Sequence, residues 1–179
     1  MKILSSSSIE DIAYIVCTTL DAAGCTAVLS GGGAATIYAP AAKTTDDLDF
    51  ILQLSAGVNP DAAPLLELGF RSTGRSGIYQ HPSVVYTLEF PLGPLAVGDE
   101  LITKWDTLRR EDLVLHIVTP TDCVRDRLAA AIHWNDFNSI SQAVAVAKRH
   151  PVEMVIIERW CAHEGGAKQF ETFQRLLTA

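Results

Sequence analysis

Residues 29–50 begin Leu-Ser-Gly-Gly-Gly-Ala-Ala and end Thr-Asp-Asp-Leu-Asp-Phe, and these two motifs carry most of the information about the fold. The residues before the glycines, Thr26–Leu29, predict a short buried strand, and Ala34–Tyr38 predict two turns of helix. Glycine has no Cβ, so the backbone of this turn can approach a ligand closely. Amide groups at the start of a helix form an anion site. The first motif therefore predicts a phosphate-binding turn between a strand and a helix.

The second motif introduces two carboxylates into an apolar run that predicts a strand through Leu54. Side chains two residues apart on a strand share a face, so we expect Asp47 and Asp49 to project together. The apolar neighbours of Asp49, which are Leu48 and Phe50, then point into the core. Paired carboxylates beside a phosphate-binding turn are what metal-dependent phosphoryl or nucleotidyl transfer requires.

This order of motifs resembles the DNA-polymerase-β-like nucleotidyltransferase superfamily. The residues that match are Gly31-Gly32, then Thr45, then Asp47 and Asp49 on either side of an apolar residue. The likeness is greatest to small bacterial stand-alone members, akin to abortive-infection and toxin-type nucleotidyltransferases, and covers about the first half of the chain. It implies an α/β (α+β) fold, with a nucleotidyltransferase-like mixed β-sheet flanked by helices and followed by a C-terminal helical segment.

A third acid lies in the apolar run Ser83–Phe90, which predicts another strand. On that strand Glu89 shares a face with Thr87 and Val85. A carboxylate in an apolar strand is costly to bury unless it is paired or binds a cation. The family carries a third carboxylate on a strand beside the acidic pair, and the resemblance gives this place to Glu89, although many members have the shorter Asp there. The alternative is that Glu89 lies at a strand end and faces water.

The resemblance implies a metal-dependent nucleotidyltransferase that moves a nucleoside monophosphate from an NTP, such as ATP, to an acceptor hydroxyl and releases pyrophosphate. Asp47, Asp49 and Glu89 would bind Mg²⁺ or Mn²⁺, with Glu89 also the candidate base. The residues expected to bind the nucleotide and its phosphates are Ser30, Gly31, Gly32, Thr45 and Arg127. The sequence leaves the acceptor open among a small molecule, a protein and RNA.

The remaining strands and the first helix are predicted from local patterns. Ser7–Ala23 predicts an amphipathic helix, with Ser7 and Glu10 as a capping box. Leu101–Trp105 and Asp112–Val118 predict two strands joined by a charged turn. On the second of these strands we interpret His116, which has apolar neighbours, as a hydrogen-bonded structural residue.

The pattern changes to helices at Thr119. Thr119 as the cap and Pro120 at the first helical position predict a helix start. We therefore expect a nucleotidyltransferase-like core over residues 1–118 and a C-terminal helical segment over residues 119–179, packed as one unit. In this half the resemblance is looser, because Arg127 replaces the family's usual lysine and binds phosphate through a planar fork instead of a point charge.

Composition narrows the class of protein. The net charge of −7 argues against general nucleic-acid binding and slightly against RNA as the acceptor. Half of the 14 basic residues lie between Lys104 and Arg149, where they form either a local basic face or ordinary solvated charge. No apolar run approaches the roughly 20 residues of a membrane span. The four cysteines lack metal-site spacing, so we expect reduced thiols in a cytoplasmic protein.

Two other interpretations stay open. The same fold could be a catalytically silent nucleotide-binding or protein-interaction module, with a protein partner as in toxin–antitoxin pairs, or the two motifs could be coincidental in an ordinary α/β domain. A Rossmann site is disfavoured because position 36 is threonine, and no Gly-Lys-Ser/Thr is present for a P-loop. His163-Glu164 lacks the second histidine of a metalloprotease helix, and we interpret it as surface.

Overall fold

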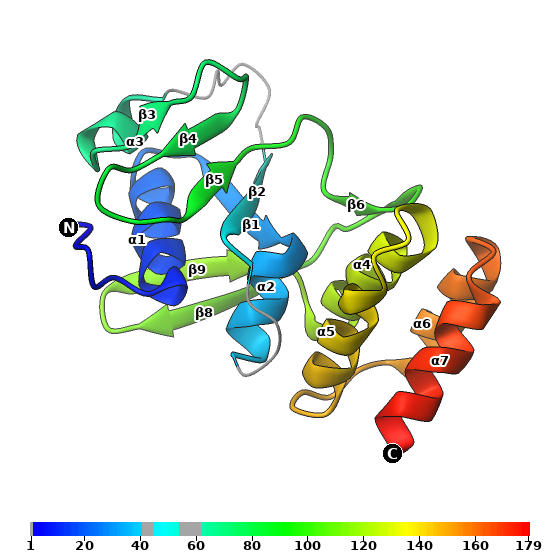
Figure 1. Ribbon diagram of the computed structural model, residues 1–179. Coiled ribbons are helices and arrows are strands. Elements are labelled where there is room, and N and C mark those ends of the chain that lie inside the picture. Colours follow the sequence, from blue (N-terminus) through cyan, green and yellow to red (C-terminus); the bar gives the residue numbers. More distant parts are fainter. Residues whose placement is uncertain (1, 41–44, 54–61) are drawn as a thin grey trace. The chain divides into compact units, whose positions relative to one another are not determined.

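The computed structural model describes residues 2–40, 45–53 and 62–179 of the 179-residue chain. These residues form seven helices and nine strands (Figure 1). They belong to two compact units: unit 1 is Met1–Leu29, Asp46–Leu95 and Trp105–Ile117, and unit 2 is Ser30–Thr45, Ala96–Lys104 and Val118–Ala179. The predicted α+β class, with a mixed sheet, is confirmed.

Unit 1 is built on a seven-stranded sheet. The strands are, in spatial order, β3 (Arg71–Ser72), β4 (Ile78–Gln80), β5 (Thr87–Glu89), β2 (Asp47–Gln53), β1 (Thr26–Ser30), β9 (Leu113–Ile117) and β8 (Asp106–Arg110). The pairs β2–β5 and β1–β9 are parallel, whereas β3–β4, β4–β5 and β8–β9 are antiparallel. Parallel neighbours need long crossover connections, so the two central pairs bring together segments far apart in the chain.

Helix α1 (Ile9–Ala22) packs on the sheet of unit 1 through the apolar stripe that the sequence predicts. Ile12, Val16 and Leu20 are all buried, and each such side chain contributes about 1.5–3 kcal/mol by leaving water. The predicted cap was wrong by one residue. Ser8, not Ser7, caps the helix, and its capping box is closed by Asp11.

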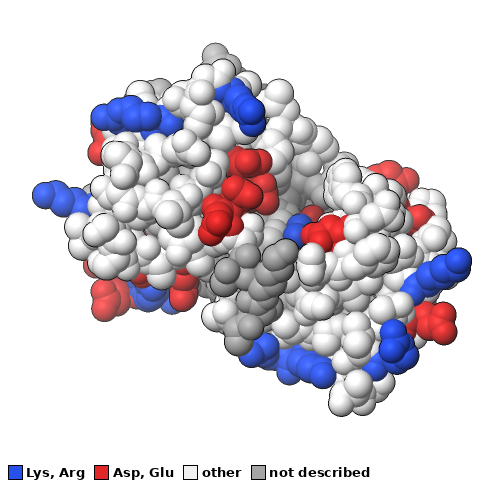
Figure 2. Space-filling model, viewed as in Figure 1, with Lys and Arg blue, Asp and Glu red and all other residues white. Residues whose placement is uncertain are grey.

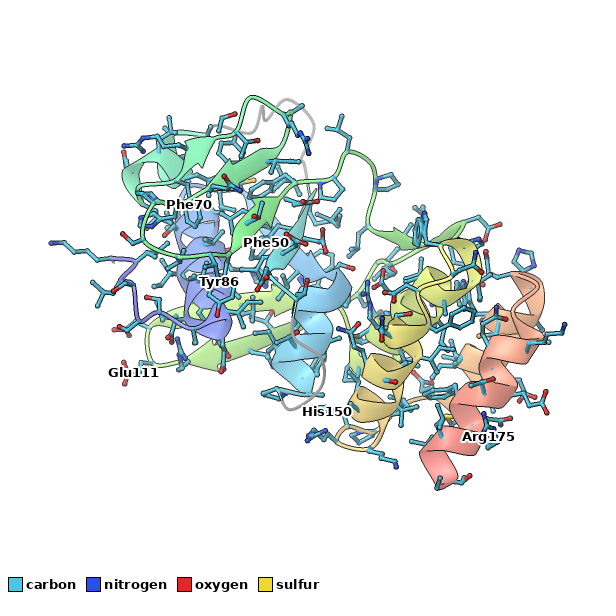
Figure 3. All side chains as sticks on the ribbon, viewed as in Figure 1. Phe50, Phe70, Tyr86, Glu111, His150 and Arg175 are labelled. Atoms are coloured by element: carbon cyan, nitrogen blue, oxygen red, sulfur yellow. The ribbon has the colours of Figure 1, made fainter. Side chains whose placement is uncertain are left out.

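The core of unit 1 lies between the sheet and its helices. Phe50 and Phe70, labelled in Figure 3, are fully buried, and so are Leu48 and Leu88 on the two neighbouring strands β2 and β5. Helix α3 (Ala63–Glu67) follows β2 in the chain. Its predicted start at Asn59–Asp61 lies outside the described residues.

One predicted strand was wrong. Of Leu101–Trp105, only Leu101 lies in a strand; β8 begins at Asp106, and a turn at Glu111 with φ of 54° leads into β9. The apolar pattern of the earlier segment has another cause, because Ile102 is buried without strand pairing. The preceding residues instead form a two-stranded hairpin, β6 (Ala96–Val97) and β7 (Glu100–Leu101).

Unit 2 consists of this hairpin and five helices. They are α2 (Gly31–Tyr38), α4 (Pro120–His133), α5 (Phe137–Ala147), α6 (Met154–His163) and α7 (Ala167–Thr178). Helix α4 contacts each of the other four helices and strand β6. It starts as predicted, with the Thr119 hydroxyl accepting a hydrogen bond from the amide of Asp122. Helix α2 and strand β6 come from residues 1–118, so the helices after Thr119 pack with part of that range. The predicted division into residues 1–118 and 119–179 stays a prediction.

The buried ring of Trp160 on α6 connects the β6–β7 hairpin to the helices of unit 2 through a hydrogen bond. Its indole Nε1 donates a hydrogen bond of 3.2 Å to the carbonyl oxygen of Val97 on β6. Elsewhere in this unit the ring of His150, labelled in Figure 3, meets the ring of Tyr38 edge to face, and its Nε2 lies 2.9 Å from the Tyr38 carbonyl oxygen. Among the described residues, no helix has the length and apolar character needed to cross a membrane.

Candidate acidic site and glycine turn

The two aspartates of the second motif lie on strand β2. Asp47 is exposed and Asp49 is half-buried, whereas Leu48 between them is fully buried, as is Phe50. This alternation is the one predicted from the sequence. It follows because a strand sends successive side chains to opposite faces, and only one face of β2 covers the core.

Strand β5 brings the third acid to the same face. It runs parallel to β2 in a register that pairs Asp47 with Thr87 and Asp49 with Glu89. Paired residues on neighbouring strands lie about 5 Å apart and project to the same side of the sheet. Figure 2 shows acidic side chains gathered over β2 and β5. The two strands therefore bring the three predicted acids together on one face of unit 1.

Strand β5 is shorter than the predicted strand Ser83–Phe90, and Glu89 is its last residue. The carboxylate is half-buried at the end of the strand, with Asp49 beside it. Within the described residues, the oxygens of the three acids do not form a cluster closer than 4.8 Å. Side-chain rotation is therefore needed before all three can contact one cation.

Gly77 fixes the chain just after Glu89. Its φ of 73° is in the left-handed region that favours glycine, and a Cβ there would lie 2.7 Å from the carbonyl oxygen of Phe90. The amide of Phe90 donates a hydrogen bond of 2.8 Å to the carbonyl oxygen of Gly77. This close backbone contact positions the end of β5, and with it Glu89.

The glycine turn belongs to unit 2, and its helix starts earlier than predicted. Helix α2 begins at Gly31, not at Ala34, so the three glycines form its first turn. Gly31 has a φ of 68°, a conformation that a side chain disfavours. Ser30 is the N-cap, is 8% exposed and makes no side-chain capping bond. The first turn of this helix contains no carboxylate, so none of its own side chains compensates the positive end of the helix dipole.

Two further predicted phosphate ligands, Gly32 and Thr45, lie against each other. A Cβ on Gly32 would be 3.2 Å from the Cβ of Thr45, which is closer than ordinary van der Waals contact. The carbonyl oxygen of Gly32 accepts a hydrogen bond of 2.9 Å from the Thr36 hydroxyl, as an ordinary helical residue would. Only glycine fits this position without displacing Thr45.

Arg127, the predicted phosphate ligand on α4, is surrounded by polar partners. Its guanidinium donates to Asp126 at 2.6 and 2.9 Å and to the side-chain oxygen of Gln142 at 3.5 Å. Whether it also binds phosphate stays a prediction. The three acids thus belong to unit 1, and the five predicted nucleotide ligands belong to unit 2.

His116 has the structural role predicted from its surroundings. Its Nδ1 lies 2.9 Å from the Thr107 hydroxyl, and its Nε2 lies 3.1 Å from the carboxylate of Asp21. Both ring nitrogens are therefore engaged by neighbouring elements of unit 1. These contacts link β9 to β8 and to α1.

Sequence reasoning missed an apolar cavity in unit 1. It has a volume of about 240 Å³, and its lining includes Leu20, Leu65, Tyr79 and Phe90. Tyr79 pairs in register with Leu88, so it lies on the face of the sheet opposite to Glu89. The cavity therefore does not belong to the acidic face.

Sequence reasoning also missed a buried cation in unit 2. Arg125 is 5% exposed, donates to Asp122 and Glu100, and stacks over the ring of Trp160 at 5.4 Å. Two carboxylates neutralise its charge, so this arrangement serves as an anchor between α4 and the hairpin. Helical periodicity cannot identify such a residue, because its partner Glu100 is remote in the sequence.

No protein-family model matches the chain, and a search of curated proteins found no match either.

Proposed function

We propose that the protein is a metal-dependent nucleotidyltransferase of the DNA-polymerase-β-like type. One observation carries the proposal: Asp49 and Glu89 are register partners on parallel strands, and Asp47 lies two residues before Asp49 on the same face. This is the order of acids that the family resemblance requires. The enzyme would act in the cytoplasm on a nucleoside triphosphate.

The donor set fits a hard divalent cation. Three carboxylates supply only oxygen ligands, which Mg²⁺ and Mn²⁺ prefer over nitrogen or sulfur. Asp47, Asp49 and Glu89 would hold the ion, which would supply charge neutralisation at the phosphates of the nucleotide. The exposure of Asp47 and the partial burial of the other two leave the oxygens accessible from solvent.

The chain's own residues would perform the remaining chemistry. Glu89, at the open end of β5, would accept the proton of the acceptor hydroxyl. The hydroxyl oxygen would then form its bond to the α-phosphorus while the bond to the bridging oxygen breaks and pyrophosphate leaves. Amide groups of the Gly31-Gly32 turn, with Ser30, Thr45 and Arg127, would bind phosphate oxygens through hydrogen bonds and the helix dipole.

The acceptor is the open part of the proposal. A small molecule, a protein side chain and an RNA end each offer a hydroxyl, and the net charge of −7 disfavours RNA. A protein acceptor or partner would make the enzyme similar to the toxin-type members that the sequence resembles.

The test is a thermal-shift titration with each NTP, with and without Mg²⁺. Ligand binding raises the melting temperature by an amount that grows with the ratio of ligand concentration to Kd. We expect a Mg²⁺-dependent rise for the wild type and its loss in Asp47→Asn/Asp49→Asn. Pyrophosphate release, measured in the same samples, reports turnover.

A matched control removes two charges from the same sheet without touching the site. Glu111→Gln/Asp112→Asn, in the exposed turn between β8 and β9, should leave the Mg²⁺-dependent shift unchanged. A Mg²⁺-dependent shift without pyrophosphate release in any condition would favour the catalytically silent binding module. No shift with any nucleotide, or an equal shift in the double aspartate variant, would remove the proposed site.

A further inference from the structure

A second group of metal-ligating side chains lies in unit 2, whereas the three acids belong to unit 1. Asp99, His163 and Glu164 each offer one ligand atom, and these atoms all lie within 4.8 Å of one another. The Nε2 atom of His163 is 3.4 Å from Oδ2 of Asp99. His133 is attached to the group, with its Nε2 2.9 Å from Oε2 of Glu164.

Three separate segments meet to form this group. Asp99 lies in the turn of the β6–β7 hairpin, His163 ends helix α6 with Glu164 as its C-cap, and His133 is the last residue of α4. The hairpin turn and Glu164 are tightly apposed. Gly98 in this turn has a φ of 62°, a conformation that favours glycine, and a Cβ there would meet the carboxylate of Glu164.

One distance in the group, that between His163 and Asp99, suits two metal ligands better than it suits a hydrogen-bonded ion pair. A hydrogen bond between nitrogen and oxygen is normally about 2.7–3.2 Å, so the 3.4 Å separation of His163 and Asp99 is long for one. Two ligands that bind tetrahedral Zn²⁺ at about 2.0–2.1 Å are about 3.3–3.4 Å apart, which matches that separation. The side chains are also accessible, because His163 is 61% exposed and Asp99 is 71% exposed.

We propose that Asp99, His163 and Glu164 form a Zn²⁺ site in unit 2. A mixture of imidazole nitrogen and carboxylate oxygen suits Zn²⁺, whereas Mg²⁺ prefers oxygen alone. Two carboxylates and a neutral imidazole balance the charge of the ion. Three protein ligands leave a fourth position for water, as in zinc sites that are not closed by the protein.

His133 acts as a positioning residue in this site. It bonds one oxygen of Glu164, and hydrogen bonds of this kind orient ligating carboxylates and tune metal affinity by about 10- to 100-fold. The ion would join the hairpin turn to the ends of α4 and α6, where Trp160 already ties β6 to α6. This proposal does not depend on nucleotidyl transfer.

The test is isothermal titration calorimetry of the full chain, free of any histidine tag, with ZnCl₂. We expect the wild type to bind Zn²⁺ and His163→Ala to bind it at least about 10-fold more weakly. Asp99→Asn should weaken binding in the same way, and because the Asp99 side chain is exposed, we expect this variant to fold as the wild type does. His133→Ala should weaken binding by about 10- to 100-fold while leaving the number of sites unchanged.

Two controls make the outcome specific. Glu158→Gln removes an exposed acid from the same helix, α6, and should bind Zn²⁺ as the wild type does. Asp47→Asn/Asp49→Asn should also keep this binding, which separates the site from the acidic face of unit 1. A wild type that takes up no Zn²⁺, or a folded His163→Ala variant whose affinity is within about twofold of the wild type, would overturn the proposal.

Discussion

Asp49 on β2 and Glu89 on β5 face each other as register partners in a parallel pair of strands. The neighbouring pair, Leu48 and Leu88, is fully buried and holds this register. A slip of one residue would turn the leucines to solvent and the acids into the core, which the hydrophobic effect opposes strongly. The apolar core therefore sets the positions of the carboxylates.

The acidic register leads to a prediction for Glu89. Glu89→Gln removes the charge and the proton acceptor without changing the shape of the side chain, so it should reduce NTP-dependent pyrophosphate release by about 100-fold or more. Glu89→Asp should retain partial activity, because the charge stays. The control is Glu67→Gln, an exposed acid on α3 of the same unit. Unchanged turnover in folded Glu89→Gln would exclude Glu89 from the reaction.

Gly32 should be sensitive to a single methyl group. Gly32→Ala places Cβ 3.2 Å from Cβ of Thr45, and such overpacking costs about 1–3 kcal/mol. The gain from a stiffer unfolded chain, about 0.4–1 kcal/mol, is smaller. We therefore expect lower stability in urea denaturation, together with weaker NTP binding. The double variant Gly32→Ala/Thr45→Gly should be more stable than Thr45→Gly alone, because the contact with Thr45 is then absent. If Gly32→Ala lowers the stability of the wild type and of Thr45→Gly equally, the contact does not matter.

Gly77 and Gly74 form a matched pair in the β3–β4 turn. Both have positive φ, 73° and 86°, so alanine at either position incurs left-handed strain of about 1–2 kcal/mol. Only at Gly77 does the new Cβ also meet backbone, at 2.7 Å from the Phe90 carbonyl oxygen. Gly77→Ala should therefore destabilise unit 1 by at least about 1 kcal/mol more than Gly74→Ala. Urea denaturation of the two variants measures the difference, and equal losses would contradict it.

The lowered pKa of Asp11 predicts that part of the free energy of unfolding depends on pH. A hydrogen bond from the backbone amide of Ser8, with help from the Ser8 hydroxyl and Arg110, holds the pKa of the Asp11 carboxyl below its ordinary 3.8. Because the pKa of Asp11 is lower in the folded state, its ionised carboxylate contributes to the free energy of unfolding above pH 3.8. This contribution is lost as the pH falls through the folded-state pKa. Asp11→Asn should thus be less stable than the wild type at neutral pH, and the two should converge below pH 3.8. A pH-independent difference in melting temperature would refute this account.

The four cysteines should be unreactive in the native protein. All four are free and buried. Burial raises the pKa of the Cys17 thiol to about 11 and that of Cys161 to about 12. Because the thiolate is the nucleophile, Ellman's reagent should label none of them rapidly at mildly alkaline pH, and all should react in guanidinium. A thiol that reacts rapidly without denaturant would reveal a local opening.

Strong local signals explain what could be predicted from the sequence. Helix α4 has a cap, a proline and an acid in its first turn, and strand β2 alternates carboxylates with buried apolar residues. Both patterns depend on residues close together in the chain, so they can be recognised without knowledge of the tertiary contacts. The cap of α1 was misplaced because Ser7 and Ser8 each have an acid three residues later. In the structure Asp11 closes the capping box with Ser8 and also accepts a hydrogen bond from Arg110, a contact that the local sequence does not reveal.

The remaining errors arise where the signal is short or distant. The strands of the β6–β7 hairpin have two residues each, which is too few for an alternating pattern. The group formed by Asp99, His133, His163 and Glu164 is spread over three segments, so no spacing rule could join its members. That Glu89 lies on a strand beside the acidic pair was expected only through the family resemblance. Its register with Asp49 was not predicted, because pairing between parallel strands leaves no local pattern in the sequence.

Unit 2 is assembled from three separate pieces of chain, Ser30–Thr45, Ala96–Lys104 and Val118–Ala179. During synthesis on the ribosome, α2 and the hairpin emerge well before α4, α5 and α6, with which they pack. The carbonyl oxygen of Val97 can accept its hydrogen bond only once Trp160 has been synthesised. A fragment that starts at residue 118 contains Trp160 but lacks Val97 as the acceptor. Folding of this unit is therefore completed only after α6 has been synthesised, and a single cut in the gene cannot yield both units intact.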